Sequence, residues 1–226
     1  MAFPSQDRHT KGSLAPVSPD NIFRSRRFQA FLDIVDEVLA EKGECRVLDI
    51  GGTIKYWQSY GIGVPEEVSI TLVNLTYEPV GDNEAFTSFV GDARDLSALP
   101  DQSFDIVHSN SVIEHVGLWK DMAAMAREVR RLAPRYFIQT PNYWFPIEAH
   151  YRLPYFHLLP DPVKQSFLLR KRRGFVPKAN DVGEASHRAQ YAFLLTHRQM
   201  QFLFPDAEIK REKFFGFTKS LMAIKR

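Results

Sequence analysis

The sequence has 226 residues, 44% of them hydrophobic and 25% charged, so it can bury the core of one domain and is not disordered throughout. With 29 Lys and Arg against 27 Asp and Glu, its net charge of +2 is too even to favour nucleic-acid binding. A single cysteine, Cys45, excludes an internal disulfide framework and a cysteine-based zinc site. We therefore expect a cytoplasmic protein with no metal site.

The amino-terminal part of the chain predicts a tail followed by a helix. Residues 1–19 are rich in Pro, Ser and charge and predict a flexible tail, which leaves 20–226 as a single domain. From Phe28 to Leu39, apolar side chains recur every three or four residues. This spacing predicts an amphipathic helix that begins near Ile22 and ends at Gly43.

Short apolar runs and helical patterns then alternate along the chain. Five β-rich runs predict strands at 46–50, 68–75, 86–90, 104–108 and 136–139. A helix is predicted between the last two, where apolar residues from Leu118 to Leu132 are spaced for one face. A helix at 196–204 and strands at 207–214 and 218–224 close the chain. This alternation predicts an α/β fold, a mostly parallel sheet with helices on both faces.

The alternation stops at residues 141–190, called the 141–190 segment below. It is too long for an idle loop, so we expect an insertion or lid on the substrate side. Its aromatic residues suit an apolar, planar, sugar-like or cationic substrate, although they could instead pack a small core of their own. The candidate substrate contacts are Tyr143, Trp144, Phe145 and Tyr151.

Residues 162–180 carry six Lys and Arg residues and no acid. With its apolar residues, this stretch predicts contact with anionic lipid or with a phosphate on the substrate. A solvated helix face is the alternative interpretation. No separate RNA-binding module is present, so nucleic acid is not the expected partner, and the sequence predicts no oligomeric state.

Four motifs follow the predicted strands, where open α/β sheets bind ligands. They are VLDIGGT at 47–53, the strand end at Asn74, GDARDL at 91–96 and SFDIVHSNSVIEHV at 103–116. Glycines directly after a buried strand let the backbone turn sharply and approach a ligand. A strand-end amide can bond a ribose diol, and a carboxylate such as Asp92 can accept a hydrogen bond from an adenine amine.

In this order and spacing, the motifs resemble the class I S-adenosylmethionine-dependent methyltransferases, most closely the type 11 group. The resemblance covers about Val47–Thr140 and implies a Rossmann-like, seven-stranded sheet with one reversed strand, with the insertion after the fifth strand. It also implies S-adenosylmethionine as cofactor. The methionine part of the cofactor would contact Asp49, Gly51 and Gly52, and its ribose would contact Asn74 and Leu75. Its adenine would lie between Asp92 and Ala93. The path to the methyl group would be lined by Ser109 and Asn110.

The predicted function is a methyltransferase for a small-molecule, glycan or lipid-type acceptor. Where the acceptor is weakly acidic, a base is needed, and His115 and His150 are the candidates. Each could instead be a structural histidine. The alternatives are an RNA methyltransferase, a degenerate methyltransferase fold that only binds, and an NAD-dependent oxidoreductase, which the missing third glycine of GxGxxG disfavours.

Overall fold

The computed structural model describes residues 19–59 and 65–226, so the predicted tail lies outside the described residues except for Pro19. Helices occupy Pro19–Lys42 (α1), Ile54–Gln58 (α2), Trp119–Leu132 (α3), Asp161–Arg170 (α4), Val182–Ala189 (α5) and His197–Leu203 (α6). Short 3₁₀ turns occupy Ile113–His115 (η1) and Phe156–Leu158 (η2). Strands occupy Cys45–Ile50 (β1), Val68–Asn74 (β2), Phe86–Val90 (β3), Ile106–Asn110 (β4), Arg135–Pro141 (β5), Glu208–Phe214 (β6) and Phe217–Lys225 (β7).

The seven strands form one sheet in the order β3-β2-β1-β4-β5-β7-β6. The first five strands are parallel, and β7 runs antiparallel to both β5 and β6. This confirms the predicted mostly parallel, seven-stranded sheet. The chain reverses its direction of winding between β1 and β4, and in such sheets ligands bind at that reversal, beyond the carboxyl ends of the strands.

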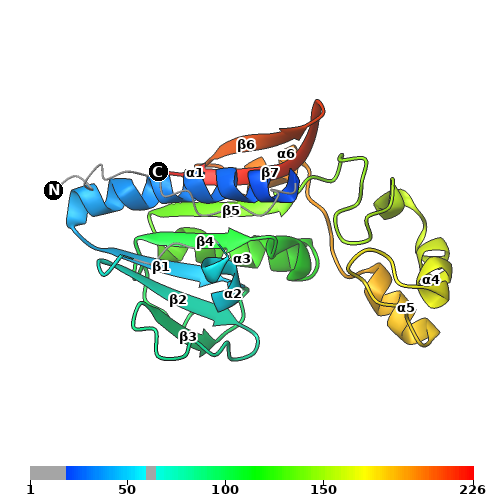
Figure 1. Ribbon diagram of the computed structural model, residues 1–226, viewed down its shortest axis with the longest axis horizontal. Coiled ribbons are helices and arrows are strands. Elements are labelled where there is room, and N and C mark those ends of the chain that lie inside the picture. Colours follow the sequence, from blue (N-terminus) through cyan, green and yellow to red (C-terminus); the bar gives the residue numbers. More distant parts are fainter. Residues whose placement is uncertain (1–18, 60–64) are drawn as a thin grey trace, which may run out of the picture.

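Helices cover both faces of the sheet, as the apolar spacing predicts (Figure 1). On one face, α1 buries Phe31, Ile34 and Val38 against the strands, joined by Trp57 of α2. On the other face, α3 packs alongside α6 and buries the predicted stripe from Met122 to Leu132. Leu118, predicted as the first residue of this stripe, precedes the helix and is 57% exposed. Burial on both faces accounts for strands that are apolar along their whole length.

Strand β4 differs from its prediction because it starts at Ile106 and ends at Asn110, two residues later. Pairing with β1 begins only where Val47 lies opposite Ile106. Before this point, the amide of Phe104 donates to the carbonyl oxygen of Leu132 and belongs to the connection from the preceding loop. The shift makes Ser109 and Asn110 the last residues of the strand, which changes what their side chains can reach.

An ion pair between the half-exposed Lys42 and the buried Asp105 joins α1 to the residue before β4. Asp105 accepts from Lys42 Nζ at 2.5 Å and from the amide of Arg46 at 2.8 Å. Burial alone would raise the pKa of Asp105, but these hydrogen bonds and charges outweigh burial and lower it. The ionised carboxylate therefore stabilises the fold.

We expect Asp105→Asn to lower the free energy of unfolding by about 2 kcal/mol near pH 7, because it removes a charge-assisted bond from a buried site. Because the folded pKa is depressed, the wild-type advantage is present above the unfolded pKa of about 4 and is lost as pH falls through the folded value. Urea unfolding at pH 7 and at pH 3 measures this. An equal difference between the two proteins at both pH values would contradict it.

The 141–190 segment lies beyond the carboxyl ends of the parallel strands, beside the sheet rather than on either face (Figure 1). It contains η2, α4 and α5, and a small core of its own made of Tyr151, Phe156, Leu168, Val176, Ala179, Ala185 and Ala189. Among the described residues, no helix is both long enough and apolar enough to cross a membrane.

Candidate active site

The VLDIGGT motif forms a tight turn held by a buried carboxylate. Asp49 lies beneath the turn, where it accepts from Trp57 Nε1 at 2.8 Å and bonds His108 Nδ1 at 2.7 Å. A Cβ added at Gly52 would lie 1.7 Å from Asp49 Oδ2, so only glycine fits there. Gly51 turns the chain with a φ of +75°. Both bonds of Asp49 go to the protein, which favours a role in orienting the turn.

At the end of β2, Asn74 donates from Nδ2 to the carbonyl oxygen of Gly52 at 2.8 Å and ties the turn to its neighbouring strand. Leu75 beside it is 73% exposed, an apolar surface that suits contact with an adenine ring. Glu78 accepts from the amide of Ile54 at 3.1 Å and so holds the other end of the turn. Sequence reasoning missed Glu78, whose only signal is an acid shortly after a strand end.

The GDARDL loop places Asp92 just beyond the end of β3. Its carboxylate is chelated by Arg94, with contacts of 2.6–2.9 Å. Hydrogen bonding from Arg94 lowers the pKa of Asp92. Ala93 packs partly against the core next to Asp92. Gly51, Asn74, Leu75 and this loop thus lie at the ends of β1, β2 and β3, an arrangement that fits S-adenosylmethionine.

The structure corrects the expectation for Ser109. Its side chain is fully buried and donates to the carbonyl oxygen of Ile50 at 3.1 Å, so it joins two strands and does not line a methyl path. Asn110 is half-buried at the last position of β4. Ser111, which has a φ of +59°, lines the cavity beyond the strand ends and donates to Gln139 Oε1 at 2.9 Å.

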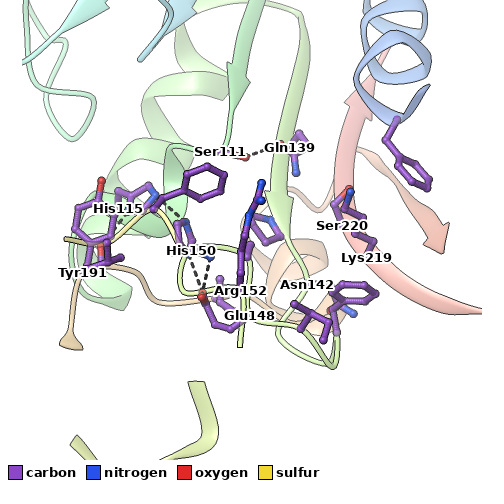
Figure 2. A pocket seen from close by; sticks show the side chains of 18 of the residues that line it. Ser111, His115, Gln139, Asn142, Glu148, His150, Arg152, Tyr191, Lys219 and Ser220 are labelled. Carbon is purple, nitrogen blue, oxygen red and sulfur yellow. Dashed lines mark hydrogen bonds and ion pairs between the residues drawn. The ribbon is translucent and has the colours of Figure 1, made fainter. Parts of the chain in front are cut away.

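A cavity of about 800 Å³ lies beyond the ends of β4 and β5, between the sheet and the 141–190 segment (Figure 2). The large apolar residues that line it are Phe23, Phe145, Ile147, Phe175, Val176, Leu194 and Phe214. The polar and charged residues that line it are Arg24, Arg27, Ser111, His115, Gln139, Asn142, Glu148, His150, Arg152, His187, Arg188, Tyr191, Lys219 and Ser220. The wall therefore combines an apolar surface with many basic groups and one acid.

The two candidate bases meet on this wall, although 35 positions separate them. His115 comes from η1 after β4 and His150 from the 141–190 segment, and their Nε2 atoms lie 3.1 Å apart. His150 Nδ1 bonds Glu148 Oε1 at 2.7 Å, and His115 Nδ1 bonds the carbonyl oxygen of Tyr191 at 2.9 Å. Each ring is thus fixed through its other nitrogen.

Two buried acids surround this pair, and sequence reasoning named neither. Glu148 accepts from the amides of His150 and Tyr151 as well as from the His150 ring. Burial raises the pKa of Glu114 to about 7. Burial also lowers the pKa of His115, whereas for His150 the bond to Glu148 and its charge outweigh burial and raise the pKa.

The structure corrects most of the aromatic contacts expected for the substrate. Among the four candidates, Phe145 lines the cavity. Tyr151 is buried in the core of the 141–190 segment and donates to the carbonyl oxygen of Arg188. Trp144 is 67% exposed, and Tyr143 packs edge-on against Trp144 and His157. Of these four residues, only Tyr151 belongs to the segment's own core, which needs large apolar side chains.

The basic residues of 162–180 make several contacts within the protein. Lys164 pairs with Asp161 at 3.1 Å, just before the stretch. Arg173 lies over the ring of Phe167, 4.9 Å from its centroid, and Arg172 donates to the carbonyl oxygen of Gly174. Part of the charge of this stretch is therefore engaged by neighbouring groups of the same segment.

Comparison with known proteins places this arrangement in a family. A family model described as a methyltransferase domain matches residues 46–135, which hold all four motifs. Residues 46–135 form a methyltransferase domain. The match covers 90 of the 226 residues, and with the sheet order it supports a class I, S-adenosylmethionine-dependent methyltransferase fold with S-adenosylmethionine as its cofactor.

Solved structures share the fold at low identity. A protein from Rhodobacter sphaeroides described as a candidate Zn-dependent alcohol dehydrogenase has a TM-score of 0.51 and 11% identity, covering 80% of this chain and 83% of its own. An S-adenosylmethionine-dependent methyltransferase from Methanosarcina mazei has a TM-score of 0.45 and 16% identity, covering 80% of this chain and 91% of its own. The magnesium protoporphyrin IX methyltransferase from Synechocystis, with bound SAH, has a TM-score of 0.45 and 14% identity, covering 94% of this chain and 90% of its own. No curated protein sequence matches this chain.

Proposed function

We propose that this methyltransferase acts on a small-molecule, glycan or lipid-type acceptor that binds in the cavity beyond β4 and β5. The observation that carries the proposal is the cavity itself. Its volume of about 800 Å³ falls within the range of roughly 300–1,000 Å³ usual for small-ligand sites. The 141–190 segment forms its outer wall, as an insertion on the acceptor side of a single domain spanning 20–226.

The lining favours an acceptor that carries negative charge as well as an apolar part. Arg24, Arg152 and Lys219 line the cavity, against the single acid Glu148. Arg152 also lies over the ring of Phe175, 4.3 Å from its centroid, so cationic and apolar surfaces adjoin. Contact of 162–180 with a phosphate or anionic lipid, and a cytoplasmic location, remain predictions from the sequence.

Methyl transfer requires in-line approach of the acceptor to the methyl carbon and exclusion of water. The cofactor supplies a methyl group on a positively charged sulfur. The acceptor's lone pair would form the bond to this carbon while sulfur keeps the electron pair of the broken S–CH₃ bond, and the acceptor's proton would pass to a histidine of the cavity wall or to water. His115 and His150 are the wall groups proposed to activate the acceptor, because both line the cavity and each ring is fixed through its Nδ1.

Calorimetry with S-adenosylhomocysteine tests the cofactor assignment. We expect wild-type protein to bind and Asp92→Ala to bind at least about tenfold more weakly, because a lost hydrogen bond to a charged group costs roughly 1.5–3 kcal/mol. Asp95→Ala is the matched control, since Asp95 is an exposed carboxylate of the same loop that caps the amide of Ser97. Absence of binding heat with folded wild-type protein would refute the function.

The position of the reaction has its own test. In a crystal structure with S-adenosylhomocysteine, we expect the sulfur to face the cavity near Ser111 and His115. A sulfur on the opposite side of the turn at Gly51, closed off from the cavity, would refute the acceptor site and leave the cofactor assignment intact.

A further inference from the structure

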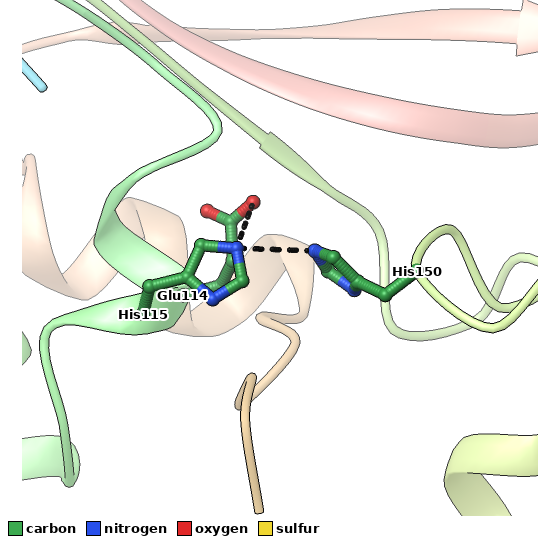
Figure 3. A group of neighbouring side chains, drawn as sticks. All are labelled: Glu114, His115 and His150. Atoms are coloured by element: carbon green, nitrogen blue, oxygen red, sulfur yellow. Dashed lines mark hydrogen bonds and ion pairs between the residues drawn. The ribbon is translucent and has the colours of Figure 1, made fainter. Parts of the chain in front are cut away.

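Three ligand-type side chains converge, two of them, His115 and His150, lining the cavity and the third, Glu114, buried beside them (Figure 3). Glu114 and His115 belong to η1, and His150 comes from the 141–190 segment. One ligand atom from each lies within 4.8 Å of the others. His115 Nε2 is 3.1 Å from His150 Nε2 and 4.0 Å from Glu114 Oε1. Residues distant in sequence thus bring two imidazoles and a carboxylate to one point.

The hydrogen bonds of the two rings leave both Nε2 atoms as lone pairs when the rings are neutral. A carbonyl oxygen can only accept, so His115 Nδ1 carries the hydrogen that bonds Tyr191. Glu148, which already accepts from two amides, likewise accepts the hydrogen of His150 Nδ1. Two lone pairs then face each other at 3.1 Å, a repulsion that either a proton or a metal ion between them relieves.

Glu114 supplies the second, independent observation. Its side chain is fully buried; Oε2 accepts from Thr140 Oγ1 at 2.9 Å, whereas Oε1 has no hydrogen-bond partner. A buried carboxylate oxygen without a partner is costly. A proton shared by the two histidines would relieve their lone pairs but would leave Glu114 Oε1 unsatisfied. A metal ion would satisfy all three atoms once Glu114 Oε1 moves closer than its present 4.0 Å from His115 Nε2, because ligands of one ion at about 2.1 Å lie roughly 3.0–3.4 Å apart.

We infer that Glu114, His115 and His150 bind a divalent transition-metal ion such as Zn²⁺ or Mn²⁺. Two imidazoles and one carboxylate are a ligand set that such ions accept, and nitrogens bound to one metal at about 2.1 Å lie roughly 3.0–3.4 Å apart. Glu148 and the carbonyl oxygen of Tyr191 hold the outer ring nitrogens in the way that orients histidine ligands at metal sites.

This inference rests on the proposed function and narrows its acceptor. Both histidines line the cavity, so the open positions of the ion would face the acceptor. A bound ion lowers the pKa of a hydroxyl that coordinates it. The acceptor atom is therefore an oxygen whose proton passes to water, and the histidines activate it as ligands rather than as free bases.

Metal titration of chelator-treated full-length protein tests the inference, with Zn²⁺ and Mn²⁺ as separate probes. For at least one of these ions, we expect one bound per chain and roughly 100-fold weaker binding in His150→Ala and Glu114→Gln. Glu148→Gln should weaken binding by about 10–100-fold, because outer partners of histidine ligands have effects of that size. His197→Ala is the control, a partly exposed histidine at the start of α6.

Binding of S-adenosylhomocysteine, measured on the same samples, keeps the outcomes separate. If the variants bind it normally but lose the metal, the site is established. If wild-type protein binds it but takes up neither ion, or if His150→Ala binds the ions as tightly as wild type, the metal site is refuted and the proposed function stands. If wild-type protein fails to bind S-adenosylhomocysteine, the proposed function is refuted, and metal uptake by the same protein still shows whether the metal site exists.

Discussion

Gly52→Ala is expected to weaken binding of S-adenosylhomocysteine by at least about 100-fold and to destabilise the fold. The added Cβ would lie 1.7 Å from Asp49 Oδ2, far inside contact distance. Either the turn moves away from the ends of the strands, or Asp49 moves and gives up its bonds to Trp57 and His108. Two buried bonds to a carboxylate are together worth about 3–6 kcal/mol. Calorimetry and urea unfolding measure the two effects.

Gly183→Ala is the matched control for this variant. Gly183 adopts no left-handed φ, and its added Cβ would come no closer than 3.2 Å, to Asp181 Oδ1 at the start of α5. We expect unchanged binding and a stability within about 1 kcal/mol of wild type, since alanine is the better helix former. Normal binding by Gly52→Ala would show that the turn does not carry the cofactor site.

The sequence predicts those helices and strands that have a clear pattern of apolar residues along their own length. The strands β1, β4 and β5 are buried on both faces, so their apolar runs stand out, whereas the edge strand β3 buries only Phe86. The stripe of α3 has one clear face. The end of β4 was displaced because pairing with β1 decides where that strand starts. The short helix α2, capped by Thr53, was missed because its five residues are too few to show a period.

The residues of the candidate site likewise fall into those that the sequence identifies and those that it does not. The turn at Gly51 and the two histidines carry residue types that chemistry needs, so they were found. Glu114 and Glu148 could not be identified from the sequence, because the sequence does not reveal whether an acidic residue is buried, and both are buried in the structure. The same ambiguity assigned Tyr151 to the substrate, whereas it packs in the segment's own core.

Gly174→Ala is the second change with a large expected effect, because this glycine holds His150 in place. Its φ is +53°, and an added Cβ would lie 2.4 Å from the carbonyl oxygen of His150 and 2.6 Å from the carbonyl carbon of Tyr151. Both are backbone atoms that cannot rotate aside. The amide of Phe175 also donates to the His150 carbonyl oxygen at 2.8 Å, so a shift there breaks the link between two parts of the segment.

For Gly174→Ala we expect a loss of about 3 kcal/mol, equivalent to a fall in melting temperature of roughly 6–12 °C for a chain of this size. Hydrogen exchange at the amide of Phe175 should speed up, while binding of S-adenosylhomocysteine stays at the wild-type level because the turn at Gly51 is untouched. The control is Gly216→Ala, whose φ is +83° with nothing within 4 Å of the added Cβ. It carries the same backbone strain, about 1 kcal/mol, without the collision. Equal losses in the two variants would show that close packing against His150 does not position this histidine.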